Sequence, residues 1–184
     1  YLQQSSINSL ADLSDTERQV LYGTLMGDAH LQKRGQSYRV KVNHSAAVSE
    51  YVDWKYDKLR RLCPTTQPPK LVKNGKYLEY EFYLSSSDIY EELHRLFYQP
   101  IDNNGKISYV KTITPELLKN LPKGPLFIAS WYMDDGSKRN DSFAGKLATQ
   151  SYSPEEHILL KDYFQEVYGW KVNTPWHIKA KNQK

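Results

Sequence analysis

Two segments of the chain place carboxylates at the end of an apolar stretch. In "WYMDDG" the pair Asp134 and Asp135 closes the run that begins at Leu126, and in "LYGTLMGDA" Asp28 closes the run that begins at Leu21. Carboxylates held at adjacent helix C-termini repel each other and the helix dipoles unless cations lie between them. Carboxylate oxygens favour magnesium or calcium. The pattern predicts a magnesium site that uses Asp28 and Asp135.

A structural interpretation competes with the metal site. Asp28 and Asp135 could be polar residues that only close their helices, and for either residue alone the two interpretations have equal weight. The tetrad "YMDD" also occurs in reverse transcriptases, but a polymerase of that kind needs a longer chain than these 184 residues. The recurrence of the acid in two similar helices favours a function.

Composition and charge limit the classes of ligand and partner that the chain can bind. The single Cys63 excludes an internal disulfide framework and a cysteine-based zinc site. Residues 30–76 hold eleven Lys and Arg against three acids, and residues 170–184 hold four Lys and no acid. These blocks, interleaved with Tyr and Trp, fit a polyanion partner, although a solvated basic surface explains them equally well. The chain has neither an 18-residue apolar stretch nor a signal peptide, so we expect an intracellular protein without a membrane partner.

Periodicity and capping signals predict the elements that position the acids. Ser14 to Glu17 form a capping box, and the alternation in "SYRVKVNHS" is typical of a strand. The prediction for the first part of the chain is helix 15–29, strand 37–45, helix 45–62, a hairpin around Asn74-Gly75 within 70–84, helix 88–98, a loop, and short helix 115–121. The second part starts with helix 125–135, which is apolar almost all round and therefore expected to be buried. It continues with strand 146–151, helix 154–168 after a second capping box, and a strand-like segment over 170–181.

The order of elements repeats. Asp28 and Asp135 are 107 positions apart, and the pairs His44 and Gln150, Lys55 and Lys161, and Pro69 and Pro175 are each 106 apart. Such agreement predicts an internal duplication, with a first half-domain over 1–123 and a second over 124–184. The second half-domain lacks counterparts for the last strand and helix of the first, so we expect it to be truncated. A natural end with an open sheet edge is the alternative.

Small residues predict how the halves meet. Gly23 and Gly27 lie four positions apart on one helix face, and Ser130 and Asp134 hold the matching places in the second helix. Small groups there allow two helix backbones to approach closely. Asp134 stands where the first helix has Gly27, so its place indicates helix packing or a backbone contact rather than a carboxylate ligand.

The segments "LYGTLMGDA" and "IASWYMDDG" resemble the two signature helices of LAGLIDADG homing endonucleases in the single-chain, two-motif branch. The resemblance covers nearly the whole chain. It implies an α+β fold of two pseudo-symmetric αββαββα units packed through their signature helices, with antiparallel DNA-binding sheets that form a saddle. It also implies a monomer with pseudo-twofold symmetry, encoded in an intron or intein, that makes a double-strand break in DNA. In such a protein "YMDD" ends a buried helix, so the likeness to a polymerase is a coincidence.

The resemblance implies roles for individual residues. Asp28 and Asp135 would hold Mg²⁺, with main-chain carbonyls of Gly27 and Asp134 as further ligands, and Ca²⁺ would bind without supporting cleavage. "VKTITP" resembles the segment that carries a basic catalytic residue, which makes Lys111 the candidate, with an ordinary loop lysine as the alternative. The equivalent residue of the second half would lie beyond Lys184. His44 and Gln150 take the place of a polar residue that orients water, with helix capping as the alternative for His44.

Basic residues on the strands are the candidates for binding double-stranded DNA, because β-ribbons fit the major groove. They are Lys33, Arg34, Arg39, Lys41, Lys70, Lys73, Lys76, Lys138, Arg139, Lys146, Lys171, Lys179 and Lys181. Glu79 and Glu81 are expected on the face opposite to Leu78 and Phe82, where they accept from cytosine or disfavour other bases. Two other functions use the same fold: an RNA-binding maturase that assists intron splicing, and a DNA-binding regulator on a decayed endonuclease scaffold.

Overall fold

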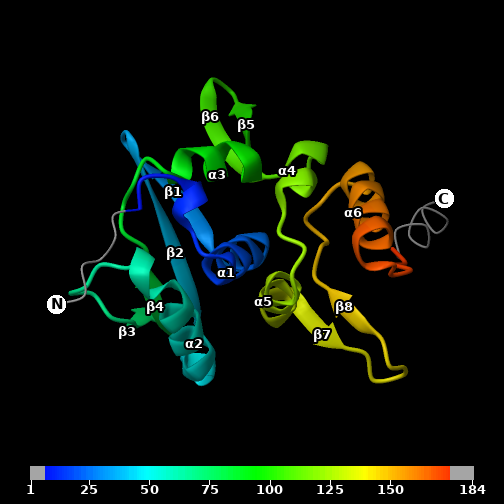
Figure 1. The fold of residues 1–184 in the computed structure, drawn as a ribbon, viewed down its shortest axis with the longest axis horizontal. Helices are drawn as coiled ribbons and strands as arrows, with labels where there is room; N and C mark the ends of the chain where they lie inside the picture. Colours follow the sequence, from blue (N-terminus) through cyan, green and yellow to red (C-terminus); the bar gives the residue numbers. More distant parts are fainter. Residues whose placement is uncertain (1–6, 175–184) are drawn as a thin grey trace. The chain divides into compact units, whose positions relative to one another are not determined.

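The computed structural model describes residues 7–174 and has an α+β fold with antiparallel sheets, as predicted (Figure 1). Contacts divide the chain into two compact units. The first unit comprises Tyr1–His94 and Pro122–Leu147, and the second comprises Arg95–Leu121 and Ala148–Lys184. This division follows contacts between elements, whereas the predicted half-domains follow the sequence repeat, which stays a prediction.

A four-stranded sheet forms the base of the first unit. Its strands are β1 (His30–Arg34), β2 (Ser37–Ser45), β3 (Lys70–Asn74) and β4 (Tyr77–Tyr83), arranged in the order β1-β2-β4-β3. The predicted strand 37–45 and the predicted hairpin at Asn74-Gly75 are confirmed. Gly75 has a φ of 58°, which a residue with a side chain rarely adopts, so this tight turn requires glycine.

Alternation gives this sheet one apolar face and one polar face. Val40, Val42 and Phe82 are almost completely buried on the face that α2 (Ser49–Leu59) packs against. The predicted helix 45–62 is this helix, flanked by the 3-10 turns η2 (Ala46–Val48) and η3 (Arg60–Leu62).

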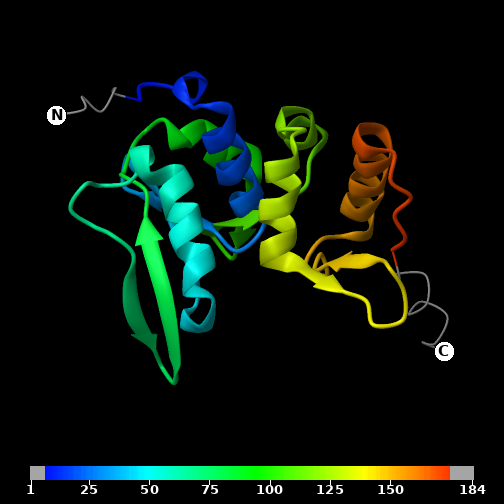
Figure 2. The ribbon, with the colours of Figure 1, turned by 60° about the horizontal axis from the view of Figure 1, so that its bottom comes forward.

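Helix α1 (Asp15–Met26) packs against α5 (Pro125–Asp135), and the two lie side by side in both views (Figures 1 and 2). The Ser14 hydroxyl accepts the N–H of Glu17, which confirms the capping box. A short 3-10 turn, η1 (Leu10–Asp12), precedes α1. Both signature helices therefore belong to the first unit, where their C-terminal ends meet.

Helix α5 differs from its prediction. It was expected to be buried all round, but Phe127 and Trp131 are buried while Met133 is 59% exposed. The apolar composition of a helix shows how much of its surface could be buried, but not how much is buried. Helix α5 buries mainly the face that contacts α1. The hairpin of β7 (Gly136–Lys138) and β8 (Gly145–Leu147) follows, where the predicted strand 146–151 proves shorter.

The second unit holds a hairpin and two helices. Strands β5 (Tyr98–Asn103) and β6 (Lys106–Lys111) pair where the sequence predicted a loop, so that prediction was wrong. The turn uses Asn104 and Gly105, both with positive φ, an Asn-Gly signal that Pro100 and the polar neighbours obscured. Helix α4 (Pro115–Asn120) follows, and α3 (Tyr90–Phe97) precedes the hairpin at the junction of the two units.

Helix α6 (Pro154–Tyr168) confirms the second capping box, since the Ser153 hydroxyl accepts the N–H of Glu156. Gly169 ends the helix with a φ of 68°. Residues 170–174 have no regular structure, so the predicted strand does not begin there, and 175–181 lie outside the described residues. Over the residues the structure describes, every helix is too short or too polar to cross a membrane.

Candidate active site

The two signature helices touch through glycine, as the spacing predicted. A Cβ on Gly23 would lie 2.4 Å from the carbonyl oxygen of Phe127 and 2.8 Å from the Cβ of Ser130. A Cβ on Gly27 would lie 2.4 Å from the Cβ of Asp134. Only the absence of a side chain at these two places allows the backbones to approach so closely.

The close approach brings Asp134 of α5 to the end of α1. Helix α1 ends at Met26, Gly27 caps it, and Asp28 is the next residue. The main-chain N–H of Asp28 donates to Oδ2 of Asp134 at 3.2 Å. The second signature helix thus contacts the backbone of the acid that the first helix presents.

The side chain of Asp134 is completely buried and is held by two residues of α2. Its Oδ1 accepts from Lys55 Nζ at 2.6 Å and from the Tyr51 hydroxyl at 2.9 Å. The side chain of Lys55 is also completely buried. Burial lowers the pKa of Lys55, and the charge of Asp134 opposes that shift. Burial, followed by the charge of Asp134, raises the pKa of Tyr51.

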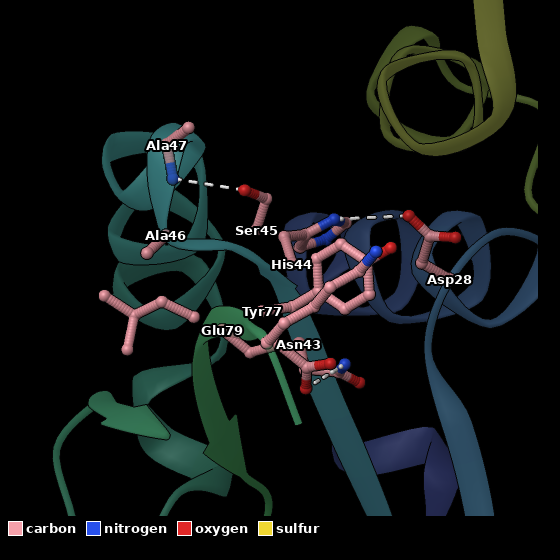
Figure 3. A pocket seen from close by; sticks show the side chains of 10 residues that line it. Asp28, Asn43, His44, Ser45, Ala46, Ala47, Tyr77 and Glu79 are labelled. Atoms are coloured by element: carbon pink, nitrogen blue, oxygen red, sulfur yellow. Dashed lines mark hydrogen bonds and ion pairs between the residues drawn. The ribbon is translucent and has the colours of Figure 1, made fainter. Parts of the chain in front are cut away.

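His44, at the end of β2, connects this buried pair to Asp28. Its Nδ1 lies 3.2 Å from Oδ2 of Asp28, as the dashed line in Figure 3 marks. Its Nε2 lies 3.0 Å from Lys55 Nζ and 3.6 Å from Oδ1 of Asp134. The Asp28 carboxylate is 46% exposed, so of the two acids here it is the one open to solvent.

This cluster of donor atoms leaves one carboxylate, that of Asp28, open to a divalent cation. One ligand atom each from Asp28, His44 and Asp134 lies within 4.8 Å of the others. Both oxygens of Asp134 already accept hydrogen bonds, which leaves the exposed carboxylate of Asp28 as the available charged ligand. Mg²⁺ commonly uses one or two carboxylates and completes its shell with water and phosphate oxygens. The residues present fit such a site.

Asp135 occupies different surroundings. It is the last residue of α5, and its Oδ2 accepts from the indole N–H of Trp131 at 3.2 Å. Among the described residues, the close donor cluster contains Asp134 rather than Asp135. The predicted metal role of Asp135, like the carbonyl roles of Gly27 and Asp134, stays a prediction.

Two predicted catalytic residues belong to the second unit. Lys111 ends strand β6 opposite Tyr98, and Gln150 is exposed in the turn before α6. In that turn Thr149 Oγ1 lies 3.0 Å from His157 Nε2, so His157 has a local structural role. The roles of Lys111 and Gln150 in catalysis stay predictions.

The register of the sheet sorts the basic residues of the first unit by face. Cross-strand partners share a face, so the pairs Gln32 with Arg39 and Asn43 with Glu81 define the polar face. This face carries Arg34, Arg39, Lys41 and Lys70, together with Glu79 and Glu81 as predicted. Lys33 and Lys73 pair with Tyr38 and Leu78 on the opposite face, so the register argues against an interface role for these two lysines.

The side chains of the polar face already contact one another. Lys41 lies 2.8 Å from Glu81, which raises the pKa of the lysine, and the guanidinium of Arg39 lies 4.0 Å from the ring centroid of Tyr83. Glu79 accepts from the side-chain amides of Asn43 at 3.0 Å and Asn74 at 2.8 Å. These contacts fix the side chains in place before any ligand arrives.

A pocket of about 520 Å³ lies at the end of this face (Figure 3). Asp28 and His44 line it on one side, and Lys76, Tyr77 and Glu79 line it at the β3–β4 end. The exposed acid and the polar face of the sheet therefore share one cavity.

The remaining candidates for DNA binding lie outside the four-stranded sheet. Lys138, Arg139 and Lys146 lie on or beside the β7–β8 hairpin, where Arg139 forms a two-bond ion pair with Asp141. Lys171 is exposed beyond α6, and Lys179 and Lys181 lie outside the described residues.

Sequence reasoning missed Lys55 and Tyr51 as site residues. A signal for Lys55 existed, because Val52, Lys55 and Leu59 form the buried stripe of α2 at helical spacing. A lysine inside an apolar stripe needs a buried partner. The sequence did not identify Asp134 as that partner, because it comes from a helix 79 residues away.

Two known proteins are similar to this chain in sequence. The "Protein RecA" of Mycobacterium gastri is 30% identical over 175 residues, which are 87% of this chain and 38% of that protein. The cytochrome b mRNA maturase bI2 of Saccharomyces cerevisiae is 30% identical over 172 residues, which are 89% of this chain and 39% of the maturase. The chain thus spans about two fifths of the length of each.

A solved structure shows the same fold. The homing endonuclease I-WcaI bound to its DNA recognition sequence matches with a TM-score of 0.65 at 20% identity, over 85% of this chain and 69% of that chain. The model of the LAGLIDADG DNA endonuclease family matches residues 18–183. Because this match covers most of the sequence, the chain belongs to the LAGLIDADG DNA endonuclease family.

Proposed function

We propose that the chain is a site-specific DNA endonuclease, encoded in an intron or intein, that acts as a monomer and hydrolyses both strands of a long target with the help of Mg²⁺. The observation that carries the proposal is the exposed Asp28 carboxylate, which His44 contacts at 3.2 Å, in a cavity continuous with the polar sheet face. The family match and the DNA recognition sequence to which I-WcaI is bound support DNA as the substrate.

In this proposal, different residues of the chain bind the DNA and take part in its hydrolysis. The basic side chains of the polar face, including Arg34 and Lys70, hold the phosphates and set the register of the duplex. Asp28 and Asp135 would hold the divalent cations, which would supply charge neutralisation and a more acidic water. His44 orients the Asp28 carboxylate, and Lys111 remains the candidate for the basic catalytic residue.

The test joins the two sequences that flank the coding element into one uninterrupted duplex. We expect the protein to cut both strands near the junction in Mg²⁺ and to bind the duplex in Ca²⁺ without cutting. A scrambled duplex of the same composition is the control. If the joined duplex stays intact although the protein binds it tightly in Ca²⁺, the result would instead support a DNA-binding protein on the same scaffold.

RNA is the second candidate ligand, because the relative from Saccharomyces cerevisiae is a maturase for cytochrome b mRNA. The exposed carboxylate of Asp28 favours the nuclease, since RNA binding alone requires no metal ligand there. Binding of the host intron RNA, measured beside the DNA duplex at equal salt, separates the two functions. A preference for RNA together with an absence of cleavage would support the maturase.

A further inference from the structure

A charged residue that reaches no solvent lies behind the site. Lys55 has a side-chain exposure of 0%, and its Nζ contacts Asp134 Oδ1 at 2.6 Å and His44 Nε2 at 3.0 Å. It also lies 4.5 Å from the ring centroid of Tyr51. A buried ammonium is costly unless it is paired and hydrogen-bonded. Neither DNA nor water can reach Lys55, so any effect it has on the reaction passes through its neighbours.

The contact with His44 determines which ring nitrogen of that histidine carries the proton. An ammonium has donors only, so His44 Nε2 must accept from Lys55. In the neutral ring the proton then lies on Nδ1, the nitrogen 3.2 Å from Asp28 Oδ2. His44 therefore donates to Asp28 and fixes the orientation of its carboxylate.

Asp134 also fixes Asp28, through a separate set of hydrogen bonds. Its Oδ1 accepts from Lys55 Nζ and holds it in place, with the Tyr51 hydroxyl as the second donor at 2.9 Å. Its Oδ2 accepts the main-chain N–H of Asp28 at 3.2 Å. One buried carboxylate from the second signature helix thus fixes both the backbone and, through Lys55 and His44, the side chain of Asp28.

We propose that Lys55 and Asp134 form a positioning pair that keeps His44 in its Nδ1–H form and aims the Asp28 carboxylate for metal binding. The inference rests on the proposed function insofar as Asp28 is a metal ligand. Residues that orient a metal ligand from behind typically change metal affinity or activity 10–100-fold when they are mutated.

The first test reads the proton on His44 directly and needs no cleavage. In ¹⁵N-histidine-labelled protein, with His44→Gln used for assignment, the wild type should show a protonated Nδ1 and an unprotonated Nε2. In Lys55→Met the proton should redistribute towards Nε2. A wild-type His44 with its proton on Nε2, or a spectrum that Lys55→Met leaves unchanged, would overturn the proposal.

Stability requires a second variant, because Lys55→Met leaves the Asp134 charge buried and unpaired. Such a loss is strongly destabilising and can unfold the chain. Lys55→Met/Asp134→Leu removes both charges, and replacement of a buried pair by apolar residues is often neutral. It should fold and show the same redistribution. Lys58→Met is the matched control, since Lys58 lies on the same helix in an exposed pair with Asp57.

The second test measures metal binding and rate. Titration with Ca²⁺, with the joined duplex present, should give an affinity about 10–100-fold weaker in the double variant than in wild type or Lys58→Met. The single-turnover cleavage rate should fall by a similar factor, with DNA affinity changed less than about twofold. Unchanged Ca²⁺ affinity would refute the positioning role. A wild type that cuts no duplex but gives the predicted histidine spectra would instead refute only the proposed function.

Discussion

At the residue scale, the exposed carboxylate of Asp28 lies beside His44, whose side chain is almost completely buried, and behind His44 lies the buried pair of Lys55 and Asp134. Asp28 was recognisable because it ends an apolar helix and recurs at the repeat interval. Its neighbours His44, Lys55 and Asp134 come from three different elements, and only the fold brings them together. The sequence placed Asp134 correctly at the helix contact, because it aligns with a glycine. Only the three-dimensional arrangement shows that this carboxylate pairs with the buried Lys55.

The exposed acid provides the most direct test of this residue set. We expect Asp28→Asn to reduce the double-strand cleavage rate by roughly 10²–10³-fold, the size typical for loss of one transition-state charge contact. DNA affinity in Ca²⁺ should stay nearly unchanged, because the basic sheet face binds the phosphates. Rates from labelled duplex and affinities from titration measure the two effects. Asp57→Asn, on an exposed helix surface, is the control, and wild-type cleavage by Asp28→Asn would rule out the metal role.

At the element scale, the contact between α1 and α5 depends on the absence of side chains. The helix boundaries follow from capping residues such as Ser14, which the sequence displays. The β5–β6 hairpin was missed because its strands carry Pro100 and mostly polar residues rather than a clear alternation. Local signals predict helix ends well, whereas an exposed hairpin with few buried side chains offers little pattern to detect.

Adding one methyl group should separate the signature helices. In an isolated helix Gly23→Ala would stabilise by about 1 kcal/mol. Here the added Cβ would lie 2.4 Å from the Phe127 carbonyl oxygen, so we expect the free energy of unfolding to fall by about 2–4 kcal/mol. Urea denaturation measures the change. Gly169→Ala, which meets no atom within 4 Å, should cost only about 1–2 kcal/mol for its φ of 68°. A Gly23→Ala protein more stable than wild type would contradict the close packing.

The N-terminus of α1 predicts a pH dependence. Arg61 donates to Glu17 at 2.7 and 2.9 Å, and this pairing lowers the pKa of Glu17 from 4.5 to about 2. The folded-state pKa is depressed, so the stabilisation is complete above pH 4.5 and is lost as pH falls towards about 2. In Arg61→Met the free energy of unfolding should drop at neutral pH, and the difference from wild type should shrink over that window.

Chemical denaturation at several pH values measures this effect. Arg60→Met, on the same 3-10 turn, is the control and should keep the wild-type pH profile. A constant difference between wild type and Arg61→Met from pH 7 to 2 would show that the ion pair is not the cause.

At the scale of the whole molecule, the distribution of charge matters more than its net value of +4. The sequence located the basic block and the elements that carry it. It did not assign every lysine to a face, because a strand's register is set by pairing with its neighbours. The fold class followed from two helices and the order of elements around them. The segment after α6 was predicted as a strand, but residues 170–174 have none, and a strand requires a partner that local alternation does not specify.

Two adjacent residues of β1 test the assignment of faces. Arg34 lies on the polar face and Lys33 on the opposite one, and both are exposed. Arg34→Ala should weaken DNA binding and lower the salt slope by about 1. Lys33→Ala, which removes the same charge, should leave the slope unchanged. Affinities between 50 and 200 mM salt measure both, with a wild-type loss of about 10³–10⁵-fold if six to ten phosphates are contacted. Equal effects of the two variants would overturn the assignment.

The contact between Gly27 and Asp134 also restricts how such proteins can be recombined. A chimera with glycine at both position 27 and position 134 would bury Lys55 without a counter-ion. A chimera with aspartate at both positions would place two carboxylates where there is room for only one. The two signature helices are therefore complementary rather than interchangeable. Grafting a half from another family member onto this chain should yield a folded hybrid only when the incoming helix supplies the missing member of the pair.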